Sequence, residues 1–307
     1  METMYLTHPA CRLHEMGSWH PESPQRLDAI SDQLLASGLM PYLDDRQAPQ
    51  ASRHDILRVH TVQYLNSLRE HVPEQGYFPI DPDTLMNPHT YEAALYAAGA
   101  GVAAVDAVLG GEARTAFCAV RPPGHHACRS QAMGFCFLNN VAIAAQHAID
   151  FHGLSRVAIV DFDVHHGNGT EDIFAGDDRV LMCSFFQHPF FPNSGAENPA
   201  ANMLNVPVAA YTGGAAVRAI VTDTWLPALE AHRPELILVS AGFDAHREDD
   251  MGQMGLVEAD YAWITEQLVE VAERHCQGRI VSTLEGGYNL SALGRSVVAH
   301  IRALAKL

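Results

Sequence analysis

Residues 157–169 constrain the fold of this chain more than any other segment. They read Val-Ala-Ile-Val-Asp-Phe-Asp-Val-His-His-Gly-Asn-Gly, an apolar, β-branched run that ends in two aspartates and two histidines. Because successive side chains of a strand point to opposite faces, Asp161, Asp163 and His165 are predicted to share one face. His166 would then point the other way. Carboxylates and an imidazole at the mouth of a buried strand suit a divalent metal, whereas a solvated strand end is the alternative.

The chain has 307 residues, a length that allows one large α/β domain or two small ones. Hydrophobic residues make up 48% and charged residues 18%, which is typical of a globular chain with a sizeable core. No run of 18 or more apolar residues predicts a membrane span, and no membrane partner is expected. The first residues lack the pattern of a secretory signal, so we expect a cytoplasmic protein.

The net charge of −17, with histidines neutral, disfavours nucleic acid as a partner. It favours cationic substrates or partners, although solubility alone explains it equally well. The six cysteines form no C-x-x-C pair, and several lie in apolar strand-like runs. The sequence therefore predicts neither a disulfide framework nor a four-cysteine zinc site. Any metal would use histidines and carboxylates.

Apolar strand-like runs alternate with longer helix-like segments along the chain. The candidate strands are residues 115–120, 157–162, 180–185, 236–241 and 280–284. The candidate helices include residues 23–36, 88–109, 139–151, 215–231 and 258–275. This alternation predicts an α/β fold, with a mostly parallel sheet covered by helices on both faces.

Reactive residues follow four of these strands. The four segments are Arg121-Pro-Pro-Gly-His-His126, Asp163-Val-His-His-Gly-Asn168, Gly242-Phe-Asp244 and Glu285-Gly-Gly-Tyr288. Ligands of open parallel sheets bind at the carboxyl ends of the strands. We therefore expect the four segments to meet in one site.

Three residues in these segments have the donor atoms of a metal site. Asp163, His165 and Asp244 offer nitrogen and oxygen ligands. Three protein ligands leave positions open for water and a substrate carbonyl, which is typical of catalytic rather than structural zinc. Asp244 alone would be interpreted as a turn or helix cap, but its position after a buried strand favours the metal.

Other residues of the segments suit proton transfer and oxyanion stabilisation. His125 and His126 form a pair in a Pro-Pro-Gly turn and indicate a general base and a general acid. Asp161 is in position to orient one of the two imidazoles. Tyr288 follows two glycines and is either a packed tyrosine or a donor to an oxyanion.

The sequence resembles the histone deacetylase family within the arginase–deacetylase fold, closest to class II and the bacterial deacetylase-like amidohydrolases. The motifs are HPESPQR (20–26), RPPGHHA (121–127), GFCFLNN (134–140), DFDVHHGNGT (161–170), SAGFDAH (240–246) and LEGGYNL (284–290). They occur in family order and span nearly the whole chain. The resemblance implies one three-layer αβα domain over residues 1–307 and a stand-alone bacterial enzyme.

The resemblance also implies a role for each matching residue. Asp163, His165 and Asp244 would hold Zn²⁺. His126 would be the general base and acid, with His125 as its electrostatic partner backed by Asp161. Tyr288 would polarise the substrate carbonyl, and Asn168 stands behind His126, where class I members carry an aspartate.

The remaining implied roles concern the substrate tunnel and a second kind of ion. Phe135 and Phe191 would form the tunnel walls, with Gly134 beside them. Asp83 would be the rim carboxylate that holds the substrate backbone, and Asp81 is its rival for that role. A K⁺ or Na⁺ ion would bind backbone groups of Asp161, Asp163 and His165, together with Ser184 and Phe185.

The implied reaction is zinc-dependent removal of acetyl or other acyl groups from the side-chain amine of acylated lysine, in a peptide or protein. One alternative is an acetylpolyamine amidohydrolase. Another is a catalytically inactive module that binds acyl-lysine. A ureohydrolase of the arginase type would need further carboxylates and histidines for two manganese ions, which are not found. Apolar surface helices and the loop over residues 187–205 leave a homo-oligomer open.

Overall fold

The computed structural model describes residues 3–307 and is built around one eight-stranded parallel sheet. The strand order is β2-β1-β5-β10-β9-β6-β7-β8, and every neighbouring pair is parallel. Residues 78–86 add a small antiparallel pair, β3–β4. The strands are β1 Thr3–Thr7, β2 Leu43–Gln47, β3 Phe78–Pro79, β4 Leu85–Met86, β5 Thr115–Cys118, β6 Val157–Asp161, β7 Val180–Gln187, β8 Met203–Val208, β9 Leu236–Ala241 and β10 Ile280–Leu284.

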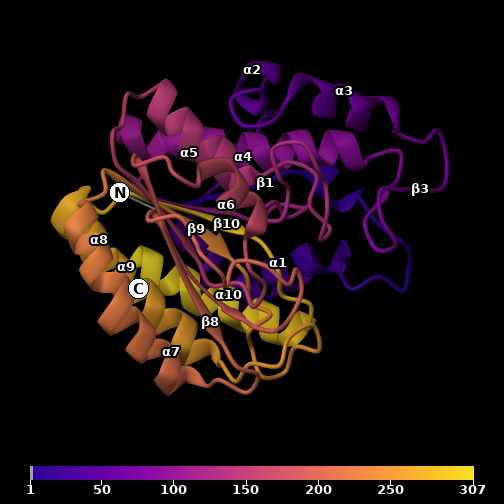
Figure 1. The fold of residues 1–307 in the computed structure, drawn as a ribbon. Coiled ribbons are helices and arrows are strands. Elements are labelled where there is room, and N and C mark those ends of the chain that lie inside the picture. The colour runs from indigo at the N-terminus through magenta and orange to yellow at the C-terminus, as the bar shows by residue number, and fades with distance from the viewer. Residues whose placement is uncertain (1–2) are drawn as a thin grey trace.

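Helices cover both faces of the sheet, as the sequence predicts (Figure 1). α4 and α5 pack together on one face, and α1, α9 and α10 pack together on the other. The helices are α1 Gln25–Ala36, α2 Arg53–Ile56, α3 Val62–Glu70, α4 Thr90–Gly110, α5 Asn140–Asp150, α6 Asn168–Phe174, α7 Gly214–Ile220, α8 Leu226–His232, α9 Glu258–His275 and α10 Leu290–Ala305.

The five predicted strands are confirmed, and the other strands of the sheet were not predicted. β9 and β10 have the predicted bounds, and β5 and β6 end one or two residues earlier than expected. The candidate strands do not include β1 or the two edge strands, β2 and β8. β2 reads Leu-Asp-Asp-Arg-Gln and β8 contains a proline, so neither shows the apolar run by which buried strands are recognised.

The helix predicted over residues 215–231 is interrupted. α7 and α8 are joined by a π-helical turn over Val221–Trp225. Pro227 lies in the first turn of α8 and lacks the N–H that a continuous α-helix requires. Widening of the turn before the proline accommodates this missing donor.

α4 is long and apolar enough to span a bilayer by length and composition. In the structure, 61% of the residues in its most apolar window are buried, and the helix packs against α5, β5, β10 and β1. α4 is therefore a core helix of this fold. The sequence contains no uninterrupted run of 18 apolar residues, but the mean hydropathy of α4 is still high enough for a membrane span.

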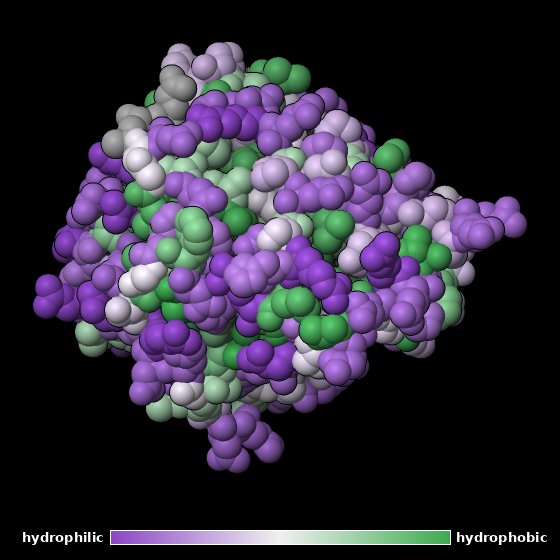
Figure 2. Space-filling view, turned by 90° about the horizontal axis from the view of Figure 1, so that it is seen from above, coloured by the Kyte–Doolittle hydropathy of each residue, from purple (hydrophilic) through white to green (hydrophobic). Residues whose placement is uncertain are grey.

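One face of the molecule is mainly polar. Figure 2 shows a face on which hydrophilic residues predominate and hydrophobic residues occur in small separate groups. The most exposed large apolar side chains include Tyr211 at 81% and Trp19 at 69%. The six cysteines are all free, as predicted.

Candidate active site

The four strands with reactive C-terminal segments are neighbours at the centre of the sheet. Their order is β5-β10-β9-β6, and their parallel pairing brings all four carboxyl ends to the same edge. Segments that are far apart in the sequence therefore meet there, as the strand-end argument predicts.

Asp163, His165 and Asp244 converge at this edge. The Nδ1 atom of His165 lies 3.1 Å from Asp163 Oδ1 and 3.2 Å from Asp244 Oδ2. All three residues are buried, and Asp244 Oδ2 makes no hydrogen bond. A buried carboxylate oxygen without a donor, beside two further ligand atoms, fits a divalent cation.

Two glycines allow the backbone to come close to these carboxylates. A Cβ atom on Gly242 would lie 2.0 Å from Asp163 Oδ2, and one on Gly286 would lie 2.1 Å from Asp244 Oδ2. The Gly286 N–H donates to Asp163 Oδ2 at 2.8 Å, and the Val164 N–H donates to Asp244 Oδ1 at 2.9 Å. Backbone N–H groups thus orient both carboxylates, and Asp244 Oδ2 is left without a donor among the residues that the structure describes.

The ligands meet for a different reason from the one expected. β6 ends at Asp161, so strand alternation does not extend to Asp163 and His165. In the following loop the Asp163 N–H donates to Asp161 Oδ1, and the His165 N–H donates to Asp163 Oδ1. His166 does point elsewhere, and its Nε2 lies 2.5 Å from Glu171 Oε2.

Without a cation, the ligand cluster has strongly displaced pKa values. Burial and the Asp163 charge raise the pKa of Asp244 to about 7. Burial alone would lower the pKa of His165, but the adjacent carboxylates of Asp163 and Asp244 raise it to about 10. The two buried carboxylates therefore attract positive charge, which a metal supplies as well as a proton does.

His125 and His126 lie beside the ligands and differ in their surroundings. His125 Nδ1 lies 2.9 Å from Asp161 Oδ2, and its Nε2 lies 3.7 Å from Asp163 Oδ2. Burial opposes a charge on His125, but the two aspartates outweigh it and hold its pKa well above the ordinary value. Burial and the neighbouring His125 charge hold the pKa of His126 well below the ordinary value. The two imidazoles thus differ in their tendency to carry a proton, which is higher for His125 than for His126.

Asn168 sets the orientation of the His126 ring. Its Oδ1 lies 2.7 Å from His126 Nδ1, and its Nδ2 faces the sulfur atoms of Cys128 and Met133 at 3.4 and 3.3 Å. The amide oxygen therefore accepts the proton on Nδ1. The Nε2 atom of His126 is left unprotonated and able to accept a proton.

Glu285 is a buried residue of the site to which the sequence analysis gave no role. Its Oε2 accepts the N–H groups of Gly124 and His125 at 2.7 and 3.0 Å. Burial raises its pKa to about 7. Glu285 thus ties the histidine turn after β5 to the end of β10. The sequence feature that could have identified Glu285 is its position in the Glu-Gly-Gly-Tyr segment that follows β10.

A cavity of about 230 Å³ opens beside the histidines. Its lining includes all five predicted residues of the tunnel and its chemistry, namely Asp83, Gly134, Phe135, Phe191 and Tyr288. It also includes three residues that were not anticipated, namely Phe190, Asp250 and Met251. A larger open hollow of about 800 Å³ between α9 and α10 contains none of the predicted site residues.

Gly134 and Phe135 have a backbone conformation that few residues adopt. Their φ angles are 58° and 68°, in the left-handed region. A Cβ on Gly134 would lie 2.5 Å from the His126 ring, so only glycine fits against that imidazole. The turn directs the Phe135 ring into the cavity, where it meets Tyr288 edge to face at 6.0 Å between centroids.

The two candidate rim carboxylates, Asp83 and Asp81, have different surroundings in the structure. Asp83 is exposed and lines the cavity. Asp81 instead accepts the N–H groups of Asp83 and Thr84 through its Oδ1, at 3.1 and 2.7 Å. Asp81 therefore shapes the turn that presents Asp83.

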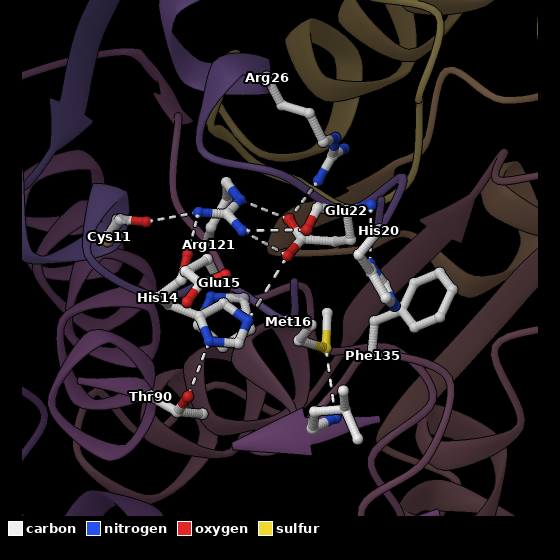
Figure 3. A network of polar contacts seen from close by, with 12 residues as sticks. Cys11, His14, Glu15, Met16, His20, Glu22, Arg26, Thr90, Arg121 and Phe135 are labelled. Carbon is white, nitrogen blue, oxygen red and sulfur yellow. Dashed lines mark hydrogen bonds and ion pairs between the residues drawn. The ribbon is translucent and has the colours of Figure 1, made fainter. Parts of the chain in front are cut away.

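A buried ion network joins Glu22 to Arg26 and Arg121 (Figure 3). Glu22 accepts from Arg26 at 3.0 Å and from Arg121 Nη2 at 2.6 Å, and all three side chains are fully buried. Arg26 also donates to the Gly287 carbonyl at 2.7 Å, and its guanidinium lies 4.9 Å from the centre of the Tyr288 ring. The network therefore ties the HPESPQR and RPPGHHA segments to the turn that carries Tyr288.

Comparison with known proteins gives the same assignment as the motifs. A model of the histone deacetylase domain matches residues 20–304. The chain is 42% identical to the histone deacetylase-like amidohydrolase of Pseudomonas aeruginosa, covering 88% of this chain and 73% of that protein. It is 38% identical to the polyamine deacetylase HDAC10 of Homo sapiens, covering 92% of this chain and 44% of that protein.

A solved structure agrees with these matches. The crystal structure of the HDA15 HD domain superposes with a TM-score of 0.94 at 33% identity, covering 99% of this chain and 90% of that one. The fold and the site define a hydrolase of the deacetylase and amidohydrolase type. The chain belongs to the histone deacetylase family. Relatives come from bacteria, archaea, plants and animals, so a bacterial source stays a prediction.

Proposed function

We propose that the chain is a zinc-dependent amidohydrolase that removes acetyl or other acyl groups from the side-chain amine of acylated lysine. The observation that carries this proposal is the convergence of Asp163, His165 and Asp244 beside His125 and His126 at an aromatic-walled cavity. The apolar methylenes of an acylated lysine suit such a cavity, and its neutral amide needs no charged partner inside.

The donor set supports zinc as the ion of this site. One imidazole nitrogen and two carboxylate oxygens leave coordination positions open, as catalytic zinc requires. When bound, zinc would polarise the acyl carbonyl and lower the pKa of a bound water. Ser184 Oγ is buried without a hydrogen-bond partner on the strand beside β6, which supports a K⁺ or Na⁺ site there.

The side chains of this chain would move the protons. His126 Nε2 would take a proton from the attacking water and later give it to the leaving amine. His125, held charged by Asp161, would stabilise the negative charge that develops nearby. The Tyr288 hydroxyl would donate to the oxyanion, and the burial that raises its pKa keeps this proton on the oxygen.

The substrate class is tested by assays on enzyme of known metal content. Acetate release from acetyl-lysine peptides should exceed acetate release from acetylputrescine. The reverse order would replace the acyl-lysine proposal with the polyamine alternative. Tight binding of acetyl-lysine peptides without acetate release would indicate an inactive binding module instead.

Replacing His126 by alanine should lower kcat by about 10²-fold or more, because the proposed base and acid is lost. Zinc content should be unchanged, since His126 is not a proposed ligand. Steady-state kinetics with elemental analysis of the same sample would measure both. A near-normal kcat in the His126→Ala enzyme would assign the base to another residue.

An acetylpolyamine substrate is the second candidate, favoured by a specific feature of the cavity. Asp83 and Asp250 both line it, and both are exposed. Two carboxylates at the mouth of a cavity would attract the free amine of a polyamine, and the net charge of −17 acts in the same direction. A peptide would use the rim differently, because its backbone N–H groups are donors.

The Asp83→Ala change separates these substrates. We expect a loss of about 10-fold in kcat/KM for an acetyl-lysine peptide, equivalent to about 1.4 kcal/mol for the lost hydrogen bonds to a carboxylate. The loss for acetylputrescine should be smaller, because it offers no backbone N–H and Asp250 at the same rim still attracts its free amine. Asp250→Ala is the matched control at the same rim. Equal losses for both substrates in Asp83→Ala would assign Asp83 a structural role.

A further inference from the structure

A second cluster of metal-ligand side chains lies outside the active site, where the end of α5 packs against α4 (Figure 1). Asp106 belongs to α4, His147 to α5, and His152 follows α5. One ligand atom of each lies within 4.8 Å of the other two. The Nε2 atoms of His147 and His152 are each 2.7 Å from the same oxygen, Asp106 Oδ1. The three side chains thus converge on one point.

His147 is held in an orientation that suits a metal ligand. The residue is 5% exposed, and its ring stacks on Phe151 with 4.9 Å between centroids. Its Nδ1 lies 3.5 Å from Asp55 Oδ1 and makes no hydrogen bond. The ring therefore lies between two carboxylates, whereas a neutral imidazole has one proton to donate. A cation at Nε2 with the proton on Nδ1 satisfies both sides, and a carboxylate behind the second nitrogen is common among metal-bound histidines.

In the part of the chain that the structure describes, the negative charge of Asp106 is not balanced by a neighbouring lysine or arginine, which favours binding of a cation. Arg58 lies 3.6 Å from Asp55 Oδ1 and balances that carboxylate. Within residues 3–307, the ion-pair contacts of Asp106 are with His147 and His152, and no lysine or arginine is among them. The Asp106 side chain is 49% exposed, so its side of the cluster is open to water.

We propose that Asp106, His147 and His152 form a second site for a zinc-type divalent cation, distinct from the one in the active site. Two imidazoles and a carboxylate are donors that zinc uses, and solvent can supply the fourth ligand. Ligand atoms around tetrahedral zinc are about 3.3 Å apart, so Asp106 must move outward by several tenths of an ångström. Its exposure allows that movement.

This second cation stabilises the fold instead of taking part in the reaction. α5 begins beside the active site, where Asn139 caps the helix and its side-chain amide donates to the Ala127 carbonyl at 3.1 Å. The 11 residues of α5 span roughly 16 Å, so His147 lies towards the far end of the helix. A cation there ties α4 to α5 and the loop after it. Because it binds the folded chain, it raises the free energy of unfolding.

The experiment is a zinc titration of metal-stripped full-length protein, with the bound zinc counted by elemental analysis. The wild type should bind two zinc ions, and His152→Ala and His165→Ala should each bind one. His152→Ala loaded with zinc should keep its deacetylase activity and lose part of the zinc-dependent rise in melting temperature. His89→Ala is the matched control, because His89 is an exposed histidine at the other end of α4, and it should still bind two.

The outcomes are distinct for the two sites. The proposal of a second site would be refuted if His152→Ala still bound two zinc ions. It would also be refuted if the wild type bound one zinc ion and His165→Ala bound none. Loss of one ion in His152→Ala with none lost in His165→Ala would uphold it and contradict the proposed active-site metal. If His152→Ala does not fold, Asp106→Asn provides the same test, because it keeps the shape of the side chain and removes its charge.

Discussion

His165→Ala should lose active-site zinc and amide hydrolysis together. His165 Nδ1 lies within 3.2 Å of oxygens from both Asp163 and Asp244, so its removal leaves two buried carboxylates without the third ligand. Elemental analysis and an acetyl-lysine assay on one sample would measure both losses. We expect activity to fall below detection.

Chelation of the wild type is the control for this variant. A strong chelator should abolish hydrolysis, and added zinc should restore it in the wild type but not in His165→Ala. Circular dichroism would show that the variant is folded. Full activity in wild-type protein that contains no metal would refute the metal mechanism.

Tyr288→Phe should lower kcat by about 10²–10³-fold, because the change removes one hydroxyl donor to the oxyanion and keeps the ring. KM should change much less, since the lost interaction is made mainly in the transition state. Packing of the ring against Phe135 and Arg26 should persist, so folding and zinc content should match the wild type. Steady-state kinetics on acetyl-lysine peptides would measure the effect.

Substrates with activated carbonyls provide the internal control for Tyr288→Phe. Trifluoroacetyl-lysine should suffer less from the change than acetyl-lysine, because its carbonyl needs less polarisation. A wild-type rate on acetyl-lysine would show that Tyr288 is a packed residue without a part in the reaction.

The sequence predicted the central strands well because they are buried on both faces. β9 and β10 consist of unbroken apolar or small residues, so their bounds could be read directly. β2 carries charges and β8 a proline, and only their pairing with a neighbouring strand identifies them. The same limit applies to the π-helical turn before Pro227, which depends on backbone geometry that periodicity does not record.

The identities of the candidate site residues could be predicted from sequence motifs, but their arrangement in space could not. Asp163, His165 and Asp244 could be named in advance, yet their convergence depends on a loop beyond β6 and on Gly242 and Gly286. The sequence favoured Asp83 as the rim carboxylate with Asp81 as its rival, and the turn in which Asp81 accepts two N–H groups could not be read from it.

The residues missed by the sequence analysis act through contacts across the fold. Glu285 holds the turn at His125, which is 160 positions away in the chain. Asp249 accepts the N–H groups of Tyr288 and Asn289 at 2.6 and 2.9 Å. Neither role shows in local patterns, because each depends on which strand ends lie side by side.

Because of the order of the four central strands, the active site can form only in a chain that includes the last strand, β10. Each of β5, β6, β9 and β10 contributes one part of the site, and β10 lies between β5 and β9 in the sheet although it comes last in the sequence. A nascent or proteolysed chain that ends before β10 lacks Glu285 and Tyr288, and its sheet has a gap between β5 and β9. Hydrolysis during refolding should therefore return only when the last strand has inserted between β5 and β9.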